Sequence, residues 1–191
     1  MNQSQESKPR ISPLEAPFAP EVAEELSRWQ GSGGQPIALF RTLTRHLPLA
    51  RAMFPLGHYF LTRQSSLPIR VREIVIDRVC ARCGCEYEWG VHALIFAKAA
   101  GFDREQLRSL VVGDSNDACW TESDRLLINM VDALHDSSKI SAELWSKMST
   151  RWSSGQLFEL LVLAGWYHAI CFFANGLQVS LEPQGIRFPR E

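Results

Sequence analysis

The sequence predicts an all-α fold, and three observations support that prediction. Apolar residues recur in runs with helical spacing, and we identify no segment with the pattern of a strand. Glycines and prolines interrupt these runs at short intervals. Several interruptions are followed by serine, threonine or aspartate, the residue types that commonly begin helices. We therefore expect helices joined by short breaks.

The N-terminal third is expected to hold an arm followed by three helices. Residues 1–20 contain four prolines and little periodicity, which predicts an extended arm. Helices are then expected over residues 21–30, 36–46 and 49–63. A glycine-rich loop separates the first two, and Pro48 separates the second from the third.

The centre of the chain is expected to form two consecutive helices. SSLP at residues 65–68 supplies residues for a cap and a first turn. The run IRVREIVIDRVCAR that follows is apolar over most of its circumference, which predicts a largely buried helix ending at Gly84. The stretch GCEYEWGVH opens the next helix, and Gly101 is its expected C-cap.

Four further helices are expected in the C-terminal half, each beginning at a capping residue. The expected starts are Asp103, Thr121 (with a Thr-x-x-Asp capping box), Ser141, and Ser153 or Ser154. The last helix is the longest and should end near Leu177. We expect one all-α domain over residues 21–178 and a second extended arm over residues 179–191.

Composition excludes several classes of partner. The formal net charge is −1, from 20 basic and 21 acidic side chains, and no basic patch indicates nucleic acid. The N-terminal stretch has no apolar segment of the secretory type. The longest apolar run, LFELLVLAGWYHAICFFANGL, carries Glu159, His168 and Asn175, so we interpret it as a buried helix and expect no membrane partner.

The cysteines indicate a reducing cytoplasm. They are Cys80, Cys83, Cys85, Cys119 and Cys171. An odd number with three close together is unlike a secreted disulfide framework. The CARC stretch at residues 80–83 has CxxC spacing, but it lies at the end of a helix, and we interpret that spacing as coincidental.

GCEYEWGVH concentrates residues that could perform chemistry. In a helix, Cys85 and His92 share a face roughly 10 Å apart along the axis. Glu88 lies between them, three residues after the cysteine and four before the histidine. Cys85 falls in the first turn, where free N–H groups lower the pKa of a thiol. A short turn at Gly84 would let Glu73, which has Asp77 one turn further on, approach His92.

These residues also carry a family resemblance. LPIRVREIVIDRV followed by GCEYEWGVHALIFAKAAG, residues 67–101, resembles the core of the carboxymuconolactone decarboxylase family, which includes AhpD-type alkylhydroperoxidases. The family pattern is a glutamate, a cysteine twelve residues later, a second cysteine after three and a histidine after four. Glu73, Cys85 and His92 match, whereas Glu88 replaces the second cysteine. RISPLEAPFAPEV and NGLQVSLEP are also similar to decarboxylase-type members.

The resemblance implies an AhpD-like helical bundle, a homo-oligomer and a small-molecule substrate. Our first hypothesis is a cofactor-free and metal-free acid/base enzyme acting on a small organic acid or lactone. His92 would move the proton, Glu73 would orient it, Glu88 would hold a water or raise its pKa, and Cys85 would line the pocket. Further pocket candidates are Tyr87, Trp89, Asp77 and Tyr167. The apolar last helix and the proline-rich arm are candidate oligomer interfaces.

Alternatives remain open. A thiol peroxidase would use Cys85, resolved by Cys83 or by a small thiol, although Glu88 cannot act as the missing redox cysteine. A non-catalytic oligomer that binds a small ligand is a third possibility, and an ordinary helix with a solvated polar face is a fourth. A zinc site formed by Cys80, Cys83, Cys85 and His92 is disfavoured, because His92 would have to reach back two helical turns.

Overall fold

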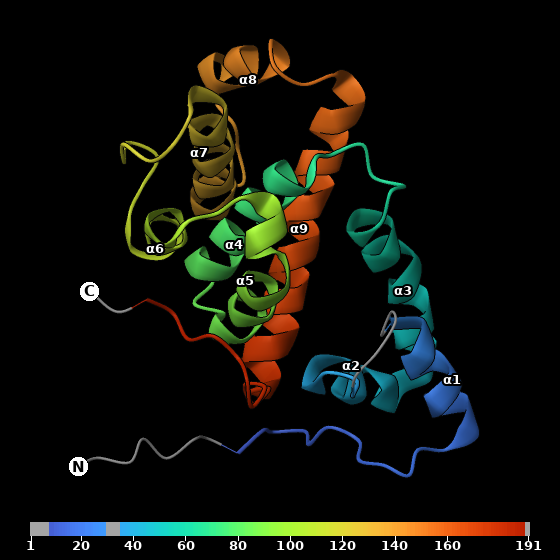
Figure 1. The fold of residues 1–191 in the computed structure, drawn as a ribbon. Coiled ribbons are helices and arrows are strands. Elements are labelled where there is room, and N and C mark those ends of the chain that lie inside the picture. Colours follow the sequence, from blue (N-terminus) through green and yellow to red (C-terminus); the bar gives the residue numbers. More distant parts are fainter. Residues whose placement is uncertain (1–7, 30–34, 190–191) are drawn as a thin grey trace, which may run out of the picture.

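The computed structural model describes residues 8–29 and 35–189, and within these ranges it is all-helical. Nine α-helices and one 3₁₀ helix lie in the described part of the chain (Figure 1). They are α1 (Pro20–Trp29), α2 (Ala38–Leu43), η1 (Thr44–His46), α3 (Leu47–Leu61), α4 (Ile69–Arg82), α5 (Glu86–Ala100), α6 (Arg104–Val112), α7 (Glu122–Ser137), α8 (Ala142–Ser149) and α9 (Ser154–Leu177). The predicted fold class is confirmed, and the expected glycine loop at 31–34 falls outside the described residues.

Helix α4 is the centre of the bundle. Nine consecutive residues, from Arg72 to Cys80, are buried, as the apolar circumference of this segment predicted. The helix packs against α5, α6, α7 and α9 (Figure 1). The buried guanidinium of Arg78 pairs with Asp132 of α7 at 2.8 Å and donates to two backbone carbonyls, so its charge is compensated. The buried part of α4 therefore holds a charged side chain whose charge is paired.

Capping residues set most of the helix starts as the sequence predicted. Asp103, Thr121 and Ser153 each form a capping box with the residue three positions later. Ser141 caps α8 by accepting a hydrogen bond from Leu144 N. Gly101 ends α5 with φ of 70°, a left-handed conformation that glycine adopts without strain.

Two expectations about helix starts were wrong. Ser65 and Ser66 do not cap α4, whose N-cap is Pro68; their hydroxyls donate instead to the Glu159 carboxylate of α9. This acceptor is charged, so it binds the hydroxyls more strongly than a neutral backbone group does. Pro48 does not separate two helices by a break but lies in the first turn of α3, where no intrahelical N–H is required.

Both terminal segments pack on the chain itself in the described residues. Arg10 N donates to Leu177 O at 2.8 Å, which ties the N-terminal segment to the end of α9. The C-terminal segment passes so close to α5 that a Cβ added at Gly90 would lie 2.2 Å from the Ile186 carbonyl oxygen. In Figure 1 both segments lack secondary structure: the N-terminal one runs along the end of the bundle where α9 ends, and the C-terminal one turns back from there beside α5.

Helix α9 is long and apolar enough to cross a membrane by length and composition alone. About 44% of its most apolar stretch is buried inside the molecule, and Tyr167 and Cys171 on its inner face contact other helices. These contacts are those of a core helix, which is the interpretation that its sequence favoured.

Candidate active site

The turn between α4 and α5 brings Glu73 and His92 together. Cys83 is the C-cap of α4, and Gly84 follows with φ of 60°. Only glycine adopts this left-handed conformation readily, and here it reverses the chain. Cys85 N then donates to Cys80 O at 2.8 Å, which fixes the angle between the two helices. Glu73 and His92 consequently face each other across the α4–α5 contact.

His92 is the hub of a buried hydrogen-bonded cluster. Its Nδ1 donates to Glu73 Oε2 at 2.7 Å. Its Nε2 shares a hydrogen bond with the Tyr167 hydroxyl of α9 at 3.1 Å and lies 3.5 Å from Glu88 Oε1 one turn back on α5. The imidazole is 3% exposed, so water competes little for these contacts. Both ring nitrogens therefore have fixed partners from three helices.

A buried arginine supports the carboxylate behind His92. Arg72 Nε donates to Glu73 Oε1 at 2.7 Å, so the two oxygens of Glu73 are divided between Arg72 and His92. Arg72 also donates to the Phe60 carbonyl at 3.1 Å, and its guanidinium lies 5.1 Å from the centre of the Phe96 ring. These contacts hold the carboxylate in one orientation and compensate its charge.

The cluster favours a protonated His92. Burial alone lowers the pKa of an imidazole, but the charge and hydrogen bond of Glu73, together with those of Glu88, outweigh it and raise the pKa of His92 to about 10. At neutral pH the ring is then an imidazolium that donates from both nitrogens. Glu88 Oε2, the other oxygen of this carboxylate, is buried without a hydrogen-bond partner in the described structure.

Asp77 is buried one turn from Glu73 and stays apart from this network. Neither of its carboxyl oxygens has a hydrogen-bond partner in the described structure. Burial raises its pKa well above the usual value, and the charge of Glu73 adds to the shift. Burial and the nearby Glu73 charge thus both favour the uncharged form of Asp77, and this residue does not line the cavity described next.

The cluster opens into a mostly apolar cavity of about 470 Å³ between α1–α3 on one side and α5 and α9 on the other. Glu88, His92 and Tyr167 form its polar floor. Six aromatic residues surround it: Trp29, Phe40, Phe54, Phe96, Trp166 and Tyr167. Arg28 also lines it, with its guanidinium 4.2 Å from the centre of the Phe54 ring. The volume suits a small organic molecule.

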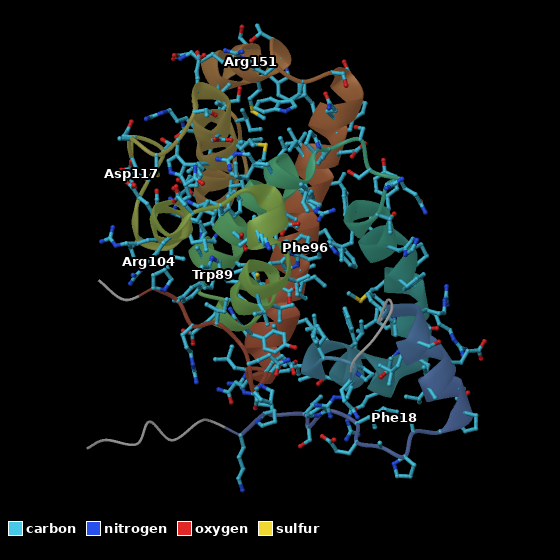
Figure 2. All side chains as sticks on the ribbon, viewed as in Figure 1. Phe18, Trp89, Phe96, Arg104, Asp117 and Arg151 are labelled. Atoms are coloured by element: carbon cyan, nitrogen blue, oxygen red, sulfur yellow. The ribbon has the colours of Figure 1, made fainter. Side chains whose placement is uncertain are left out.

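Besides Asp77, three predicted site residues lie away from this cavity. Cys85 is the N-cap of α5, is completely buried and does not line the cavity, because an N-cap residue points differently from residues inside the helix. Tyr87 donates to Glu182 at 2.7 Å and accepts from Leu39 N, so it ties the C-terminal segment to α2. Trp89, labelled in Figure 2, points away from the cavity. Its ring packs against Phe188, with ring centres 5.4 Å apart.

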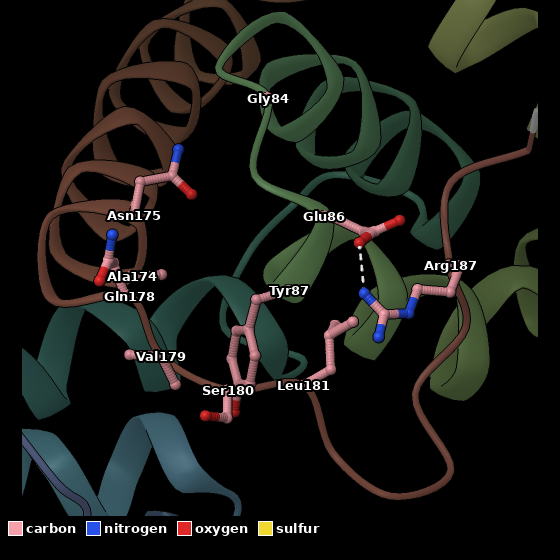
Figure 3. A pocket seen from close by; sticks show the side chains of 10 residues that line it. All are labelled: Gly84, Glu86, Tyr87, Ala174, Asn175, Gln178, Val179, Ser180, Leu181 and Arg187. Carbon is pink, nitrogen blue, oxygen red and sulfur yellow. Dashed lines mark hydrogen bonds and ion pairs between the residues drawn. The ribbon is translucent and has the colours of Figure 1, made fainter. Parts of the chain in front are cut away.

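Tyr87 borders a different pocket, an open groove of about 410 Å³ beside the end of α9 (Figure 3). Figure 3 shows Glu86 at the start of α5 and Arg187 of the C-terminal segment joined across it, at a distance of 3.0 Å. Neither Glu88 nor His92 lines this groove. The predicted residues that share the main cavity are therefore Glu88, His92 and Tyr167, with Glu73 directly behind His92.

Sequence reasoning missed Arg72, Arg28 and the cavity walls. Arg72 adjoins Glu73 in sequence, and an arginine inside an otherwise apolar helix is a signal that a buried acid lies nearby. The walls from α1 to α3 carried no comparable signal, because their aromatic residues have the spacing of ordinary core positions.

Comparison with known proteins finds a family model that matches the part of the chain holding this site. Residues 48–127 match the model of the carboxymuconolactone decarboxylase family, a range that includes Glu73, Cys85, Glu88 and His92. A search of curated proteins gave no match. Among solved structures, an uncharacterised peroxidase-related protein from Silicibacter sp. TM1040 is 14% identical, with a TM-score of 0.78 over 96% of this chain and 97% of that one.

Two other structures share the fold at similar distance. A protein of unknown function from Agrobacterium tumefaciens, described as a candidate antioxidant defence protein AhpD, is 18% identical, with a TM-score of 0.65 over 73% of this chain and 94% of that one. A cysteine-to-alanine variant of the debrominase Bmp8, in complex with 2,3,4-tribromopyrrole, is 13% identical, with a TM-score of 0.73 over 91% of this chain and 92% of that one. At these identities the likeness concerns the fold alone.

Proposed function

We propose that the chain, whose residues 48–127 match the carboxymuconolactone decarboxylase family model, is a cofactor-free acid/base enzyme acting on a small organic acid or lactone. One observation supports this most strongly. A buried imidazole, held by Glu73 on one nitrogen, presents its other nitrogen beside Glu88 and Tyr167 to an apolar cavity. Proton transfer requires a positioned donor and a positioned acceptor, and His92 and the Glu88 carboxylate can fill these two roles.

The proton transfers can be assigned to atoms. In a decarboxylation, the bond between the substrate carboxylate and its α-carbon breaks, carbon dioxide leaves, and the electron pair moves into a neighbouring carbonyl to form an enolate. The His92 Nε2–H and the Tyr167 hydroxyl stabilise the enolate oxygen, and a proton from His92 completes the product at carbon. Solvent then returns a proton to His92. For an isomerisation or lactone opening, Glu88 takes the first proton instead.

The cavity supports a substrate with an apolar body and one anionic group. Aromatic rings surround the space, and they favour a flat or unsaturated ligand. Arg28 lines the cavity and pairs with Glu25 at 3.1 Å. Its guanidinium has several N–H donors, so it can also bind a substrate carboxylate. The relative Bmp8 shows that a protein of this fold can be obtained in complex with a small halogenated ring.

The peroxidase alternative receives less support. Peroxide must reach a thiolate, and Cys85 is completely buried and outside the cavity. Glu88 stands at the cavity position next to His92, and a carboxylate cannot be oxidised to a sulfenic acid.

We further propose that the protein is a cytoplasmic homo-oligomer. Phe158, Val162 and Phe172 are 67%, 49% and 69% exposed, and their spacing places them on one stripe of α9. Leu94 and Ile95 of α5 are also exposed, at 46% and 55%. Exposed apolar side chains grouped in this way favour contact with a second copy of the chain.

Solvent-proton exchange tests the acid/base proposal without knowledge of the natural substrate. A panel of small β-keto acids, unsaturated lactones and aryl-substituted acids would be incubated with the protein in deuterium oxide, and NMR would follow deuterium incorporation and carbon dioxide release. We expect turnover of at least one compound that falls at least about a hundredfold in His92→Gln and Glu88→Gln. Glu86→Gln is the matched control, since Glu86 is on the same helix but contacts the C-terminal segment.

The alternatives give different results in the same preparations. Binding of panel compounds without exchange or turnover would support a non-catalytic ligand-binding protein. Peroxide consumption with a dithiol reductant that disappears in Cys85→Ser and survives in His92→Gln would support thiol chemistry and contradict the acid/base proposal.

A further inference from the structure

A second group of chemically active side chains lies outside the cavity. Cys83 at the end of α4, His135 in the last turn of α7 and His168 in α9 place one sulfur and two ring nitrogens within 4.8 Å of one another. His168 directly follows Tyr167, so its side chain leaves α9 about 100° round the helix axis from the one that contacts His92. None of the three residues lines the cavity.

The histidine geometry presents two ring nitrogens to one point. His168 Nδ1 lies 2.8 Å from the Ala164 carbonyl oxygen, which can only accept, so Nδ1 carries a proton. The neutral ring then offers a lone pair at Nε2. That atom lies 3.1 Å from His135 Nδ1. A backbone carbonyl that fixes the far nitrogen of a histidine is the usual second contact of a metal-bound imidazole.

Cys83 is positioned to be the third ligand of a metal ion. Its sulfur lies within 4.8 Å of the ligand nitrogens of both histidines, and zinc would bind it as the thiolate. The Cys171 thiol is completely buried and donates its one proton to the sulfur of Cys80 at 3.8 Å, so this bond does not use the Cys83 sulfur. Cys83 itself is partly exposed, as are both histidines.

We propose that Cys83, His135 and His168 bind a zinc ion, with the fourth position open to water. A tetrahedral zinc with bonds of about 2.3 Å to sulfur and 2.0–2.1 Å to nitrogen separates its ligand atoms by roughly 3.3–3.6 Å. The two nitrogens already lie at 3.1 Å, and the sulfur needs only a small side-chain movement from within 4.8 Å. The group contains no carboxylate, so calcium and magnesium, which prefer oxygen ligands, do not fit it.

Such an ion would connect three helices. Cys83 belongs to the turn that positions α5, and Asn175 of α9 already donates to the Cys83 carbonyl at 2.9 Å. The zinc would add a second link between this turn and α9, and a new one to α7. Because the unfolded chain does not hold these ligands together, zinc should bind the native state preferentially and raise its melting temperature.

The test is metal binding, measured apart from any enzymatic activity. The full chain, treated with a chelator under reducing conditions, would be titrated with zinc by calorimetry and with cobalt(II) by absorption spectroscopy. We expect one equivalent of metal, a thiolate-to-cobalt charge-transfer band with the intense visible bands of tetrahedral cobalt, and a higher melting temperature. Cys83→Ser, His135→Gln and His168→Gln should each weaken binding by at least about a hundredfold.

Two variants serve as matched controls. Cys119→Ser removes another partly exposed thiol, and His58→Gln removes a histidine outside the group; both should bind metal like the parent chain. The proposal fails if the parent binds no zinc, or if the three ligand variants bind it as well as the controls do. It also fails if peroxide forms a Cys83–Cys171 disulfide equally fast with and without zinc, because a coordinated thiolate is protected.

Discussion

Replacing Glu73 by glutamine tests whether this carboxylate sets the protonation state of His92. The amide oxygen of glutamine can still accept a hydrogen bond from His92 Nδ1, but the NH2 group then faces Arg72, and the side chain carries no charge. The change therefore removes the charge while keeping the shape. Burial, which lowers the pKa of an imidazole, would then be opposed only by Glu88, whose oxygen is 3.5 Å from the ring rather than 2.7 Å.

The magnitude follows from the pKa of His92. A pKa of about 10, against 6.5 for an unperturbed histidine, means that the cluster favours the imidazolium by about 5 kcal/mol. Glu73 makes the largest favourable contribution. We expect Glu73→Gln to lower the pKa of His92 by at least about 2 units, which corresponds to about 3 kcal/mol. The free energy of unfolding should also fall, by up to about 3–5 kcal/mol, because the buried Arg72 loses its counter-charge.

Nitrogen-15 NMR of labelled histidine, titrated between about pH 5 and 11, measures the pKa directly, and His92→Gln identifies the resonance. Glu86→Gln is the matched control, since it removes a carboxylate of α5 that does not contact His92. Should Glu73→Gln be too unstable to titrate, Glu88→Gln gives a second measurement and should also lower the pKa. A His92 pKa that stays within about half a unit of the parent value in both variants would refute the electrostatic reasoning.

Three further predictions follow from the same geometry. Tyr167→Phe should cost about 1 kcal/mol of stability and slow turnover at least about tenfold without changing the fold, as judged by kinetics and circular dichroism. The stability contributed by His92 should be complete below about pH 6.5 and lost as the pH rises to about 10, because its pKa is raised in the folded state; denaturant unfolding at several pH values measures this. Phe158→Lys with Phe172→Lys should reduce the oligomer to a smaller species in light scattering, whereas Arg104→Ala at the exposed start of α6 should not.

Local signals in the sequence were enough to predict the fold and the pairing of Glu73 with His92. Capping boxes act within four residues, so the helix starts could be found without knowing the tertiary structure. The Glu73–His92 contact required only two helices and the Gly84 turn between them. Cys85 was misplaced because a helical face was assumed for a residue that is the N-cap and has non-helical backbone angles.

The rest of the site depends on packing between distant segments. The walls contributed by Phe40 and Phe54 meet α5 only after α1–α3 dock against the bundle. The group of Cys83, His135 and His168 is assembled from three helices, and successive members are 52 and 33 positions apart in the sequence. A zinc motif with paired ligands at short spacing can be found from the sequence, but a group with no two ligands on one element cannot.

Under the proposed function, the residue at position 88 would separate acid/base chemistry from peroxide chemistry on this scaffold. Where the resembling peroxidases have a redox cysteine, this chain places a carboxylate 3.5 Å from the imidazole. The carboxylates of Glu73 and Glu88 are then balanced by Arg72 and protonated His92. If Glu88 takes a proton from a substrate carbon, the substrate becomes an enolate and the net charge of these four side chains rises by one. In a site of low polarity, this extra positive charge stabilises the enolate strongly. A thiolate at this position would supply electrons to peroxide, whereas the carboxylate can exchange only protons. Glu88→Cys should therefore abolish acid/base turnover, and a gain of peroxide reduction in that variant would show that a single side chain separates the two activities.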